Sequence, residues 1–458
     1  FMAKTIEIVN VVTEGDTIKY KLRDNTGLHL LKEEEVDAWV KYYYTENFGL
    51  SLKSLPESVL LIPAMLYLMP VTYFYGVDLV VPSMDKTLYE ELPAIYAAYS
   101  KIYGPFKEEW CGKVTVGNIV ENKPREARYD KIVFFSGGVD AVHAGINNPG
   151  ERSVLVSVPS VESLWKGKKG RVGADFIQAK ESLIREFSAV VGSDWLLVTN
   201  NFQAVVFNDG KIQHELFAKL GLASASFRFD GWFGIKYIGN MCSVAPFAYA
   251  MGIHTFVMGS AFEPLEDKPA IGDGGAHPVL SGSFQFLGIS FAEQDGISTR
   301  RSQKVKDIVE WCNVRGKKTK LWTCFQDNTE QCGKCTKCVR TQLNLLCAGE
   351  NPKEWGFESF SDKRFSKLVR SYTYMEHEPC YVWDIVDSID DGRVYPFGDG
   401  LLHWLKRIGY KEYFKRSQLV SKLNRLRCLY RIHRYPRYAR TLFRMLKGYG
   451  DEVRNGWS

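Results

Sequence analysis

The sequence predicts an α/β fold, with a doubly wound, Rossmann-like parallel sheet flanked by an amino-terminal α+β domain and a basic, mainly helical carboxy-terminal region. Two observations carry the central prediction. A continuous apolar run, Ile132–Phe135, leads into two glycines and a helix-compatible segment, which is typical of a strand buried on both faces of a parallel sheet. Strand-like and helix-like segments then alternate, which is typical of βαβ units.

The alternation continues to about residue 260 and indicates where a ligand should bind. The expected strands are Ser153–Val158, Trp195–Thr199 and Thr255–Met258, and the expected helices are Gly173–Val191 and Asn240–Met251. Ligands of such folds bind beyond the carboxyl ends of the strands. Gly259 ends the last of these strands, so we expect it to lie near the turn that follows Phe135.

At 458 residues the chain is long for one domain, and we expect domains at 1–128, 129–350 and 351–458. The first domain has no cluster of catalytic residue types, so we interpret it as a scaffold or a partner-docking module. Its expected elements are the strands Thr5–Val12 and Thr17–Leu22, joined by a hairpin turn at Glu14–Asp16, and the helices Lys32–Tyr44 and Leu88–Tyr103.

The turn after the buried strand reads Ser136-Gly137-Gly138-Val139-Asp140. Adjacent glycines let successive N–H groups point into one concavity, and the following helix adds its positive N-terminal end, so the turn predicts an anion-binding nest. A nucleotide phosphate is the expected anion, with Asp140 holding a Mg²⁺ ion that bridges phosphate oxygens. The alternative is an ordinary strand-turn-helix with a tight glycine corner.

Four cysteines crowd together at Cys324, Cys332, Cys335 and Cys338. These separations suit one tetrahedral Zn²⁺ ion, with Gly333 supplying the bend between ligands. Because every position is a cysteine, no coordination site remains for a reacting water, and the zinc is expected to be structural. Iron–sulfur ligation and four unlinked thiols are the alternatives. Three nearby cations are expected to offset the thiolate charge: Lys334, Lys337 and Arg340.

A further helix is expected to begin at Ser298 or Thr299. Its first turn holds Arg301 and Lys304, whose positive charges oppose the helix dipole. That cost is explained if the two cations meet an anion such as a triphosphate. Solvated surface charge is the alternative.

Residues 136–140 resemble the SGGxDS signature of the PP-loop ATP pyrophosphatases, with Ala141 in place of the final serine and therefore one hydroxyl donor fewer. The pattern TC-x7-CGxCxxC and the strand end Phe256–Ser260 extend the resemblance to the 7-cyano-7-deazaguanine synthase family, over about 220 of 458 residues. The resemblance implies the catalytic residues Asp140, Lys304 and Arg301. It implies that the nucleotide is bound by Phe135, Ser136, Gly137, Gly138, Val139, Asp140 and Gly259.

Enzymes of that family use ATP and Mg²⁺ to adenylate a carboxylate, release pyrophosphate and pass the acyl group to a nitrogen nucleophile. The resemblance therefore implies ATP, Mg²⁺ and Zn²⁺ as cofactors and a carboxylate similar to 7-carboxy-7-deazaguanine as substrate. The acceptor would be ammonia or an amine of a partner protein held by the flanking domains, in queuosine-like biosynthesis or antiphage defence. Two alternatives remain: a PP-loop tRNA-modifying enzyme such as a thiolase, and a binding subunit that senses nucleotide, which Ala141 suggests.

The basic character of the chain is concentrated near its carboxy-terminus. Residues 406–447 contain 14 Lys or Arg and one acidic residue, a net of +13, so the rest of the chain carries −7 within the total of +6. This segment could bind nucleic acid or an acidic protein, or it could pack on the acidic remainder of the chain. Its apolar residues recur at helical spacing: Leu419, Leu423, Leu426 and Leu429.

Ten unevenly spread cysteines favour a reducing cytoplasm over a disulfide-rich secreted class. The longest apolar run, Val59–Tyr75, is interrupted by Pro63 and Pro70, so we expect a buried helix and no membrane span. The Gly-, Pro- and Asp-rich stretch Glu263–Gly288 is interpreted either as a lid over the site or as a surface insertion.

Overall fold

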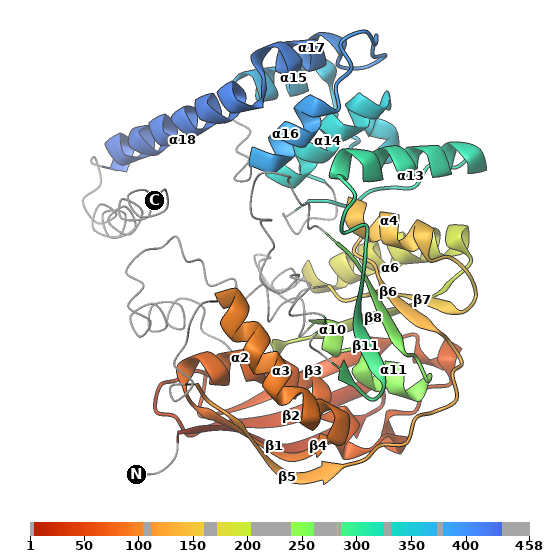
Figure 1. Cartoon of the computed structure of the whole chain (residues 1–458), viewed down its shortest axis with the longest axis vertical. Helices are drawn as coiled ribbons and strands as arrows, with labels where there is room; N and C mark the ends of the chain where they lie inside the picture. The colour runs from red at the N-terminus through yellow and green to blue at the C-terminus, as the bar shows by residue number, and fades with distance from the viewer. Residues whose placement is uncertain are drawn as a thin grey trace. The chain divides into compact units, whose positions relative to one another are not determined.

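The fold is described from a computed structural model of the chain (Figure 1). It describes residues 4–103, 111–159, 172–202, 240–260, 282, 285–324, 331–372 and 379–432. The chain divides into two compact units, the first made of Phe1–Ile212 and Phe229–Ser298 and the second of Gln213–Arg228 and Thr299–Ser458. The finer division at residues 128 and 350 stays a prediction.

The first unit is built on a large, mostly parallel sheet, so the α/β class is confirmed. Within the described residues the sheet has 11 strands in the order β10-β11-β9-β6-β7-β8-β3-β2-β1-β4-β5. The strands are β1 Thr5–Glu14, β2 Thr17–Asp24, β3 Glu35–Tyr43, β4 Asp78–Asp85, β5 Val114–Val120, β6 Lys131–Phe134, β7 Ser153–Ser157, β8 Asp194–Asn200, β9 Thr255–Gly259, β10 Gln285–Phe286 and β11 Ile289–Asp295.

Five of these strands, β11-β9-β6-β7-β8, pair in parallel. From β6 the chain passes to β7 and β8 on one side and then returns to place β9 on the other side of β6. The strand order therefore reverses between β6 and β9. In open α/β sheets the carboxyl ends of strands at such a switch point are where ligands bind.

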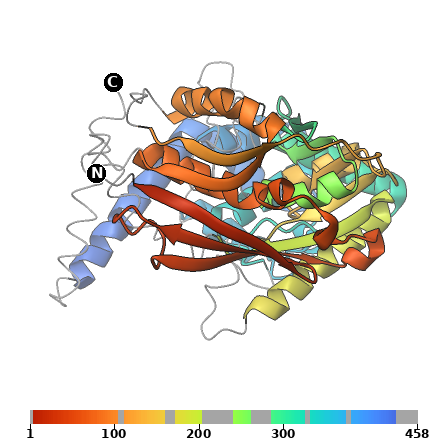
Figure 2. The same ribbon diagram turned by 90° about the horizontal axis from the view of Figure 1, so that it is seen from below.

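The amino-terminal strands extend the same sheet. Strands β1 and β2 form the expected antiparallel hairpin, and Figure 2 shows them in red beside β3. The helix predicted at Lys32–Tyr44 is wrong, because β3 lies there between β2 and β8. Ala38, Val40 and Tyr42 are buried at every second position, the two-residue period of a strand, and pairing with two neighbours outweighs the helical pattern.

The helices of this unit are α1 Glu57–Leu60, α2 Ile62–Tyr75, α3 Lys86–Tyr103, α4 Val139–Asn147, α6 Val172–Val191, α10 Asn240–Cys242 and α11 Ala245–Ala250. The described side chains of the apolar run Val59–Tyr75 are buried, as expected. No helix in the described ranges has the length and hydropathy to cross a bilayer. The single helix predicted at Asn240–Met251 is two short helices, and Pro246 lies in the first turn of the second, where its fixed φ suits a new start.

The second unit is helical in its described residues, as expected for the region after Gly356. Its helices are α13 Arg301–Arg315, α14 Thr336–Ala348, α15 Asp362–Arg370, α16 Pro379–Asp387, α17 Asp399–Ile408 and α18 Tyr410–Ile432. Helices α13, α14 and α16 pack together and α17 and α18 pack on α16. On α18, Leu419 and Leu423 are 57% and 48% exposed, so this part of the predicted leucine stripe is not core.

Candidate phosphate loop and metal centre

The predicted phosphate loop joins the carboxyl end of β6 to α4. Phe135 extends the strand pairing, because its N–H donates to the Val156 carbonyl at 2.8 Å, and its ring stacks on Phe187 with 4.6 Å between centroids. Gly137 follows with φ 84°, a value that L side chains avoid. The loop thus starts from a fixed strand end and turns at Gly137, where the backbone conformation favours glycine.

The first turn of α4 closes the loop. Gly138 is the residue before the helix, and its N–H donates to the Ser136 hydroxyl at 3.3 Å. Val139 is fully buried and anchors the turn, whereas Ser136 is exposed and Asp140 half-buried. The N–H groups of a first helical turn have no intrahelical acceptor. An anion such as a phosphate can accept from them.

Gly259 lies against this loop, as the sequence predicted. A Cβ on Gly259 would stand 2.2 Å from the carbonyl oxygen of Asp140 and 2.8 Å from the amide nitrogen of Ala141. No side chain fits at that distance. The end of β9 and the start of α4 are therefore in direct backbone contact, which explains the glycine at the end of the strand.

Lys180 is a residue of this site that sequence reasoning missed. It lies on α6, and its Nζ donates to the Ser136 carbonyl at 3.1 Å. Only 8% of the residue is exposed, and the Phe176 ring lies 5.6 Å from Nζ. Helical spacing alone places Lys180 on the sheet side of α6, but nothing in the local sequence names the loop carbonyl as its partner.

A second missed group holds the far end of α4. The Asp295 carboxylate at the end of β11 lies 2.8 Å from His143 Nδ1 and accepts from the Asn147 side-chain amide at 3.0 and 3.1 Å. Asp295 also pairs with Gly259 across the sheet. The strand that contacts the loop and the helix that follows the loop are thus tied by one carboxylate.

The four predicted cysteines of the second unit come together. Their sulfurs all lie within 4.8 Å of one another, with Cys324 to Cys335 at 4.0 Å and Cys332 to Cys338 at 3.9 Å. Four sulfurs about 2.3 Å from one tetrahedral Zn²⁺ are about 3.8 Å apart. No disulfide joins the cysteines of the described residues. The group therefore has the donors and the spacing to hold zinc.

Backbone groups shape the cysteine site. The N–H of Cys332 donates to the Cys324 sulfur at 3.4 Å and the N–H of Cys335 to the Cys332 sulfur at 3.2 Å. Gly333 turns the chain between them with φ 66°. The Gln331 side-chain amide donates to the Leu321 and Gly356 carbonyls at 2.8 and 3.1 Å. These bonds fix the four-cysteine site on the surrounding chain.

The Cys338 thiol resists ionisation at this spacing. Hydrogen bonding with the sulfurs of Cys324 and Cys335, and then burial, raise the pKa of Cys338 well above its usual range. A divalent cation reverses that preference, because it binds the thiolate form. Of the three cations expected nearby, Arg340 lies over the Tyr381 ring at 3.6 Å, so aromatic stacking holds it.

Helix α13 begins differently from the prediction. Arg300 is the residue before the helix, without a side-chain cap. The cap comes from α16 instead, where the Asp384 carboxylate accepts from the Ser302 N–H at 2.9 Å and from its hydroxyl at 2.6 Å. This cap could not be predicted from the local sequence, because Ser302 and Asp384 are 82 residues apart.

The two predicted cations of α13 are not solvated. Arg301 is 4% exposed and Lys304 0%, so the alternative of solvated surface charge is wrong. Burial raises the pKa of Asp384, against the opposing effects of its bonds to Ser302 and the charges of Arg300 and Arg301. The expected contact of Arg301 and Lys304 with a triphosphate stays a prediction.

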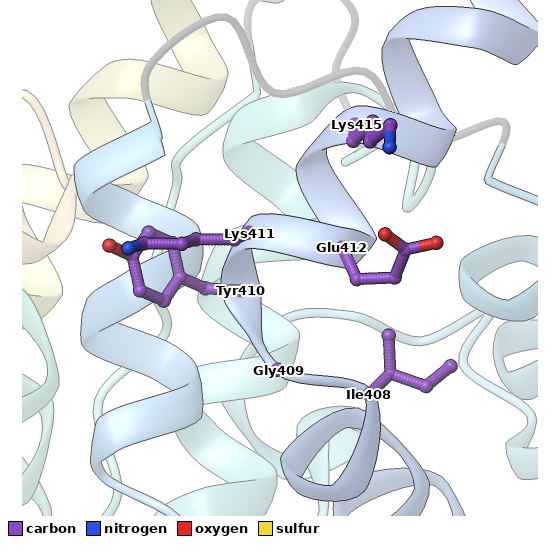
Figure 3. Close-up of a pocket in the computed structure, with 6 residues that line it drawn as sticks. All are labelled: Ile408, Gly409, Tyr410, Lys411, Glu412 and Lys415. Carbon is purple, nitrogen blue, oxygen red and sulfur yellow. The ribbon is translucent and has the colours of Figure 1, made fainter.

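A surface hollow at the start of α18 offers no convergent site. It is lined by Ile408, Gly409, Tyr410, Lys411, Glu412 and Lys415. Figure 3 shows Tyr410 and Lys411 extending to one side of the helix start, with Glu412 and Ile408 on the other. The polar groups do not point toward one another, so we assign the hollow no ligand.

Comparison of the chain with protein-family models, with curated proteins and with solved structures found no match. The resemblance to PP-loop enzymes therefore rests on the chain's own motifs. The stretch Glu263–Gly288 lies mostly outside the described residues, as does the basic segment after residue 432.

Proposed function

We propose that the chain is a PP-loop enzyme that adenylates a carboxylate with ATP, releasing pyrophosphate, and transfers the acyl group to a nitrogen nucleophile. The observation that carries the proposal is the glycine loop at the reversal of strand order between β6 and β9, with Gly259 packed against it. A backbone nest at this position is suited to a polyphosphate.

In this proposal the backbone of the loop binds the phosphates and Asp140 binds the metal. The N–H groups after Ser136, together with the start of α4, bind phosphate oxygens, and the glycines allow the backbone to approach them. Asp140, half-buried in the first turn, would hold Mg²⁺, and the ion would offset the charge of the phosphates. ATP supplies the AMP leaving group that makes a carboxylate reactive toward a nitrogen nucleophile. The family resemblance implies that Arg301 and Lys304 would offset charge in the transition state.

The four-cysteine site has a structural role in this proposal. All the ligand positions are cysteines, so a bound zinc ion has no open position for substrate. The four-cysteine site and the loop motif together support a reaction similar to that of 7-cyano-7-deazaguanine synthases. The substrate is then a carboxylate of the 7-carboxy-7-deazaguanine type, and the acceptor ammonia or an amine of a partner protein.

The test compares Asp140, which follows the loop after β6, with Asp130, which precedes β6. With Mg²⁺ present, calorimetry should detect ATP binding to the wild type, and 7-carboxy-7-deazaguanine should stimulate pyrophosphate release. Asp140→Asn should lower that release by about 100-fold or more, because it weakens the metal that neutralises the phosphates. Asp130→Asn is the matched control, since Asp130 precedes β6 and accepts from Arg152 at 2.8 Å. Absence of ATP binding to the wild type contradicts the proposal.

Two alternative functions are separated by further readings of the same samples. A tRNA thiolase needs a reactive or cluster-bound cysteine. Iron and sulfide in the purified protein would therefore favour the thiolase, whereas zinc without iron would favour the carboxylate-adenylating enzyme. A nucleotide-sensing subunit, motivated by Ala141, would bind ATP without releasing pyrophosphate for any carboxylate offered.

A further inference from the structure

Lys180 occupies an unusual position for a lysine. Its ammonium group is enclosed between the Phe176 ring and the Ser136 carbonyl, and the residue is 8% exposed. Removing an ammonium group from water is costly, and the cost is offset when the ammonium meets strong acceptors. The carbonyl it meets belongs to the peptide between Ser136 and Gly137, which is the first peptide of the phosphate loop.

The contact constrains the orientation of that peptide. In a trans peptide the C=O and N–H bonds point in opposite directions. When the Ser136 carbonyl is directed to Lys180, the Gly137 N–H, which lies in the same peptide plane, points in the opposite direction, away from Lys180. Gly137 has φ 84°, and a glycine has little resistance of its own to rotation of the adjoining peptide. Lys180 therefore supplies the restraint that the glycine lacks.

We infer that Lys180 is a positioning residue of the nucleotide site, which turns the Gly137 N–H toward the phosphates by holding the Ser136 carbonyl from behind. The inference rests on the proposed function, since it concerns the same loop. It explains why a cation lies beneath an exposed serine, and it adds a side chain from α6 to a nest otherwise formed by β6, α4 and β9. Lys180 acts through the peptide and not by touching the reacting atoms.

The peptide can be observed directly. Ser-Gly occurs at two places in the sequence, Ser136–Gly137 and Ser281–Gly282. Protein labelled with ¹³C-carbonyl serine and ¹⁵N-glycine therefore gives two carbonyl-amide correlations, and Ser281→Ala assigns them by removing one. Loss of the Lys180 hydrogen bond should shift the Ser136 carbonyl signal before any nucleotide is added. ATP with Mg²⁺ should shift the Gly137 amide signal of the wild type.

The binding experiment uses three full-length variants in calorimetry with ATP and Mg²⁺. Lys180→Met, which keeps the length and loses the donor, should weaken ATP binding by about tenfold to a hundredfold, the range expected for a charge-assisted hydrogen bond. Lys180→Arg should recover most of the affinity, because a guanidinium can donate to the same carbonyl. Lys131→Met is the control: Lys131 Nζ donates to the Asn148 side chain at 3.0 Å, at the opposite end of β6.

The outcomes are distinct. Equal ATP affinity of the wild type and Lys180→Met, with an unmoved Ser136 carbonyl signal, overturns the inference and leaves the proposed function standing. Equal loss of affinity in Lys180→Met and Lys180→Arg, each with a lowered melting temperature, also overturns it, because it shows a packing role. Absence of ATP binding to the wild type removes the proposed function itself.

Discussion

The candidate phosphate loop of the first unit and the cysteine site of the second are built in opposite ways. At the cysteine site, side chains are the ligands and backbone N–H groups hold them, as in the bond from the Cys335 N–H to the Cys332 sulfur. At the loop, backbone N–H groups are the expected ligands and side chains hold them, as Lys180 holds the Ser136 carbonyl. Ligands that are side chains can be recognised from sequence, whereas the supports of a backbone site cannot.

The largest expected effect is removal of the metal. Structural zinc in small domains contributes on the order of 10 kcal/mol to folding, so chelation should lower the melting temperature of the second unit strongly. Cys332→Ser should act in the same way, because three thiolates bind zinc more weakly. Calorimetric scans with and without chelator, paired with zinc content, measure this.

The control for the metal prediction is Cys111→Ser, a cysteine of the first unit that is partly exposed. It should leave the zinc content and the melting temperature of the second unit unchanged. If Cys332→Ser retains a full equivalent of zinc, the four-cysteine assignment is wrong.

The next largest effect concerns the backbone contact behind the loop. Gly259→Ala places a Cβ 2.2 Å from the Asp140 carbonyl, so β9 and α4 must move apart. Overpacking of this kind costs about 1–3 kcal/mol, and the displaced loop should bind ATP more weakly. Urea unfolding followed by ATP calorimetry tests both parts.

Gly400→Ala is the comparison for that substitution, because a Cβ there meets Arg370 only at 4.0 Å. It should be nearly neutral in both measurements. Wild-type ATP affinity in folded Gly259→Ala would show that the contact does not shape the loop.

The smallest effect is a pH dependence of the second unit. Burial raises the folded-state pKa of Asp384 above its ordinary value near 4. The folded state then holds a proton that the unfolded state has lost, so stability falls as pH rises from about 4 through the folded pKa. The slope cannot exceed about 1.4 kcal/mol per pH unit for one group.

Urea midpoints measured between pH 4 and 8 test the sign. Asp384→Asn should flatten this part of the profile, since the amide has no proton to lose, while Asp387→Asn on the exposed side of α16 should not. A wild-type midpoint that rises across the window, with the rise lost in Asp384→Asn, would show that the hydrogen bonds from Ser302 dominate instead.

These contrasts also show which parts of the fold and of the candidate sites could be predicted from the sequence. The buried strand Ile132–Phe135, the glycine turn, Gly259 beside it and the four cysteines were all predicted, because each depends on local pattern or on fixed spacing. The strand at Glu35–Tyr43 was predicted as a helix, since one of its two neighbours, β8, comes from a distant part of the chain. Lys180, Asp295 and the Asp384 cap were missed for the same reason: each acts on a partner far away in sequence.

The antiparallel pairing of β3 with β8 has a consequence for any shortened form of the protein. Strand β8 uses β3 on one side and β7 on the other, so a chain that starts after residue 128 would leave one row of β8 amides and carbonyls open. An open strand of this kind recruits strands from other molecules. Deleting the amino-terminal segment would therefore yield aggregates, and loss of activity in such a deletion would say nothing about docking to a partner.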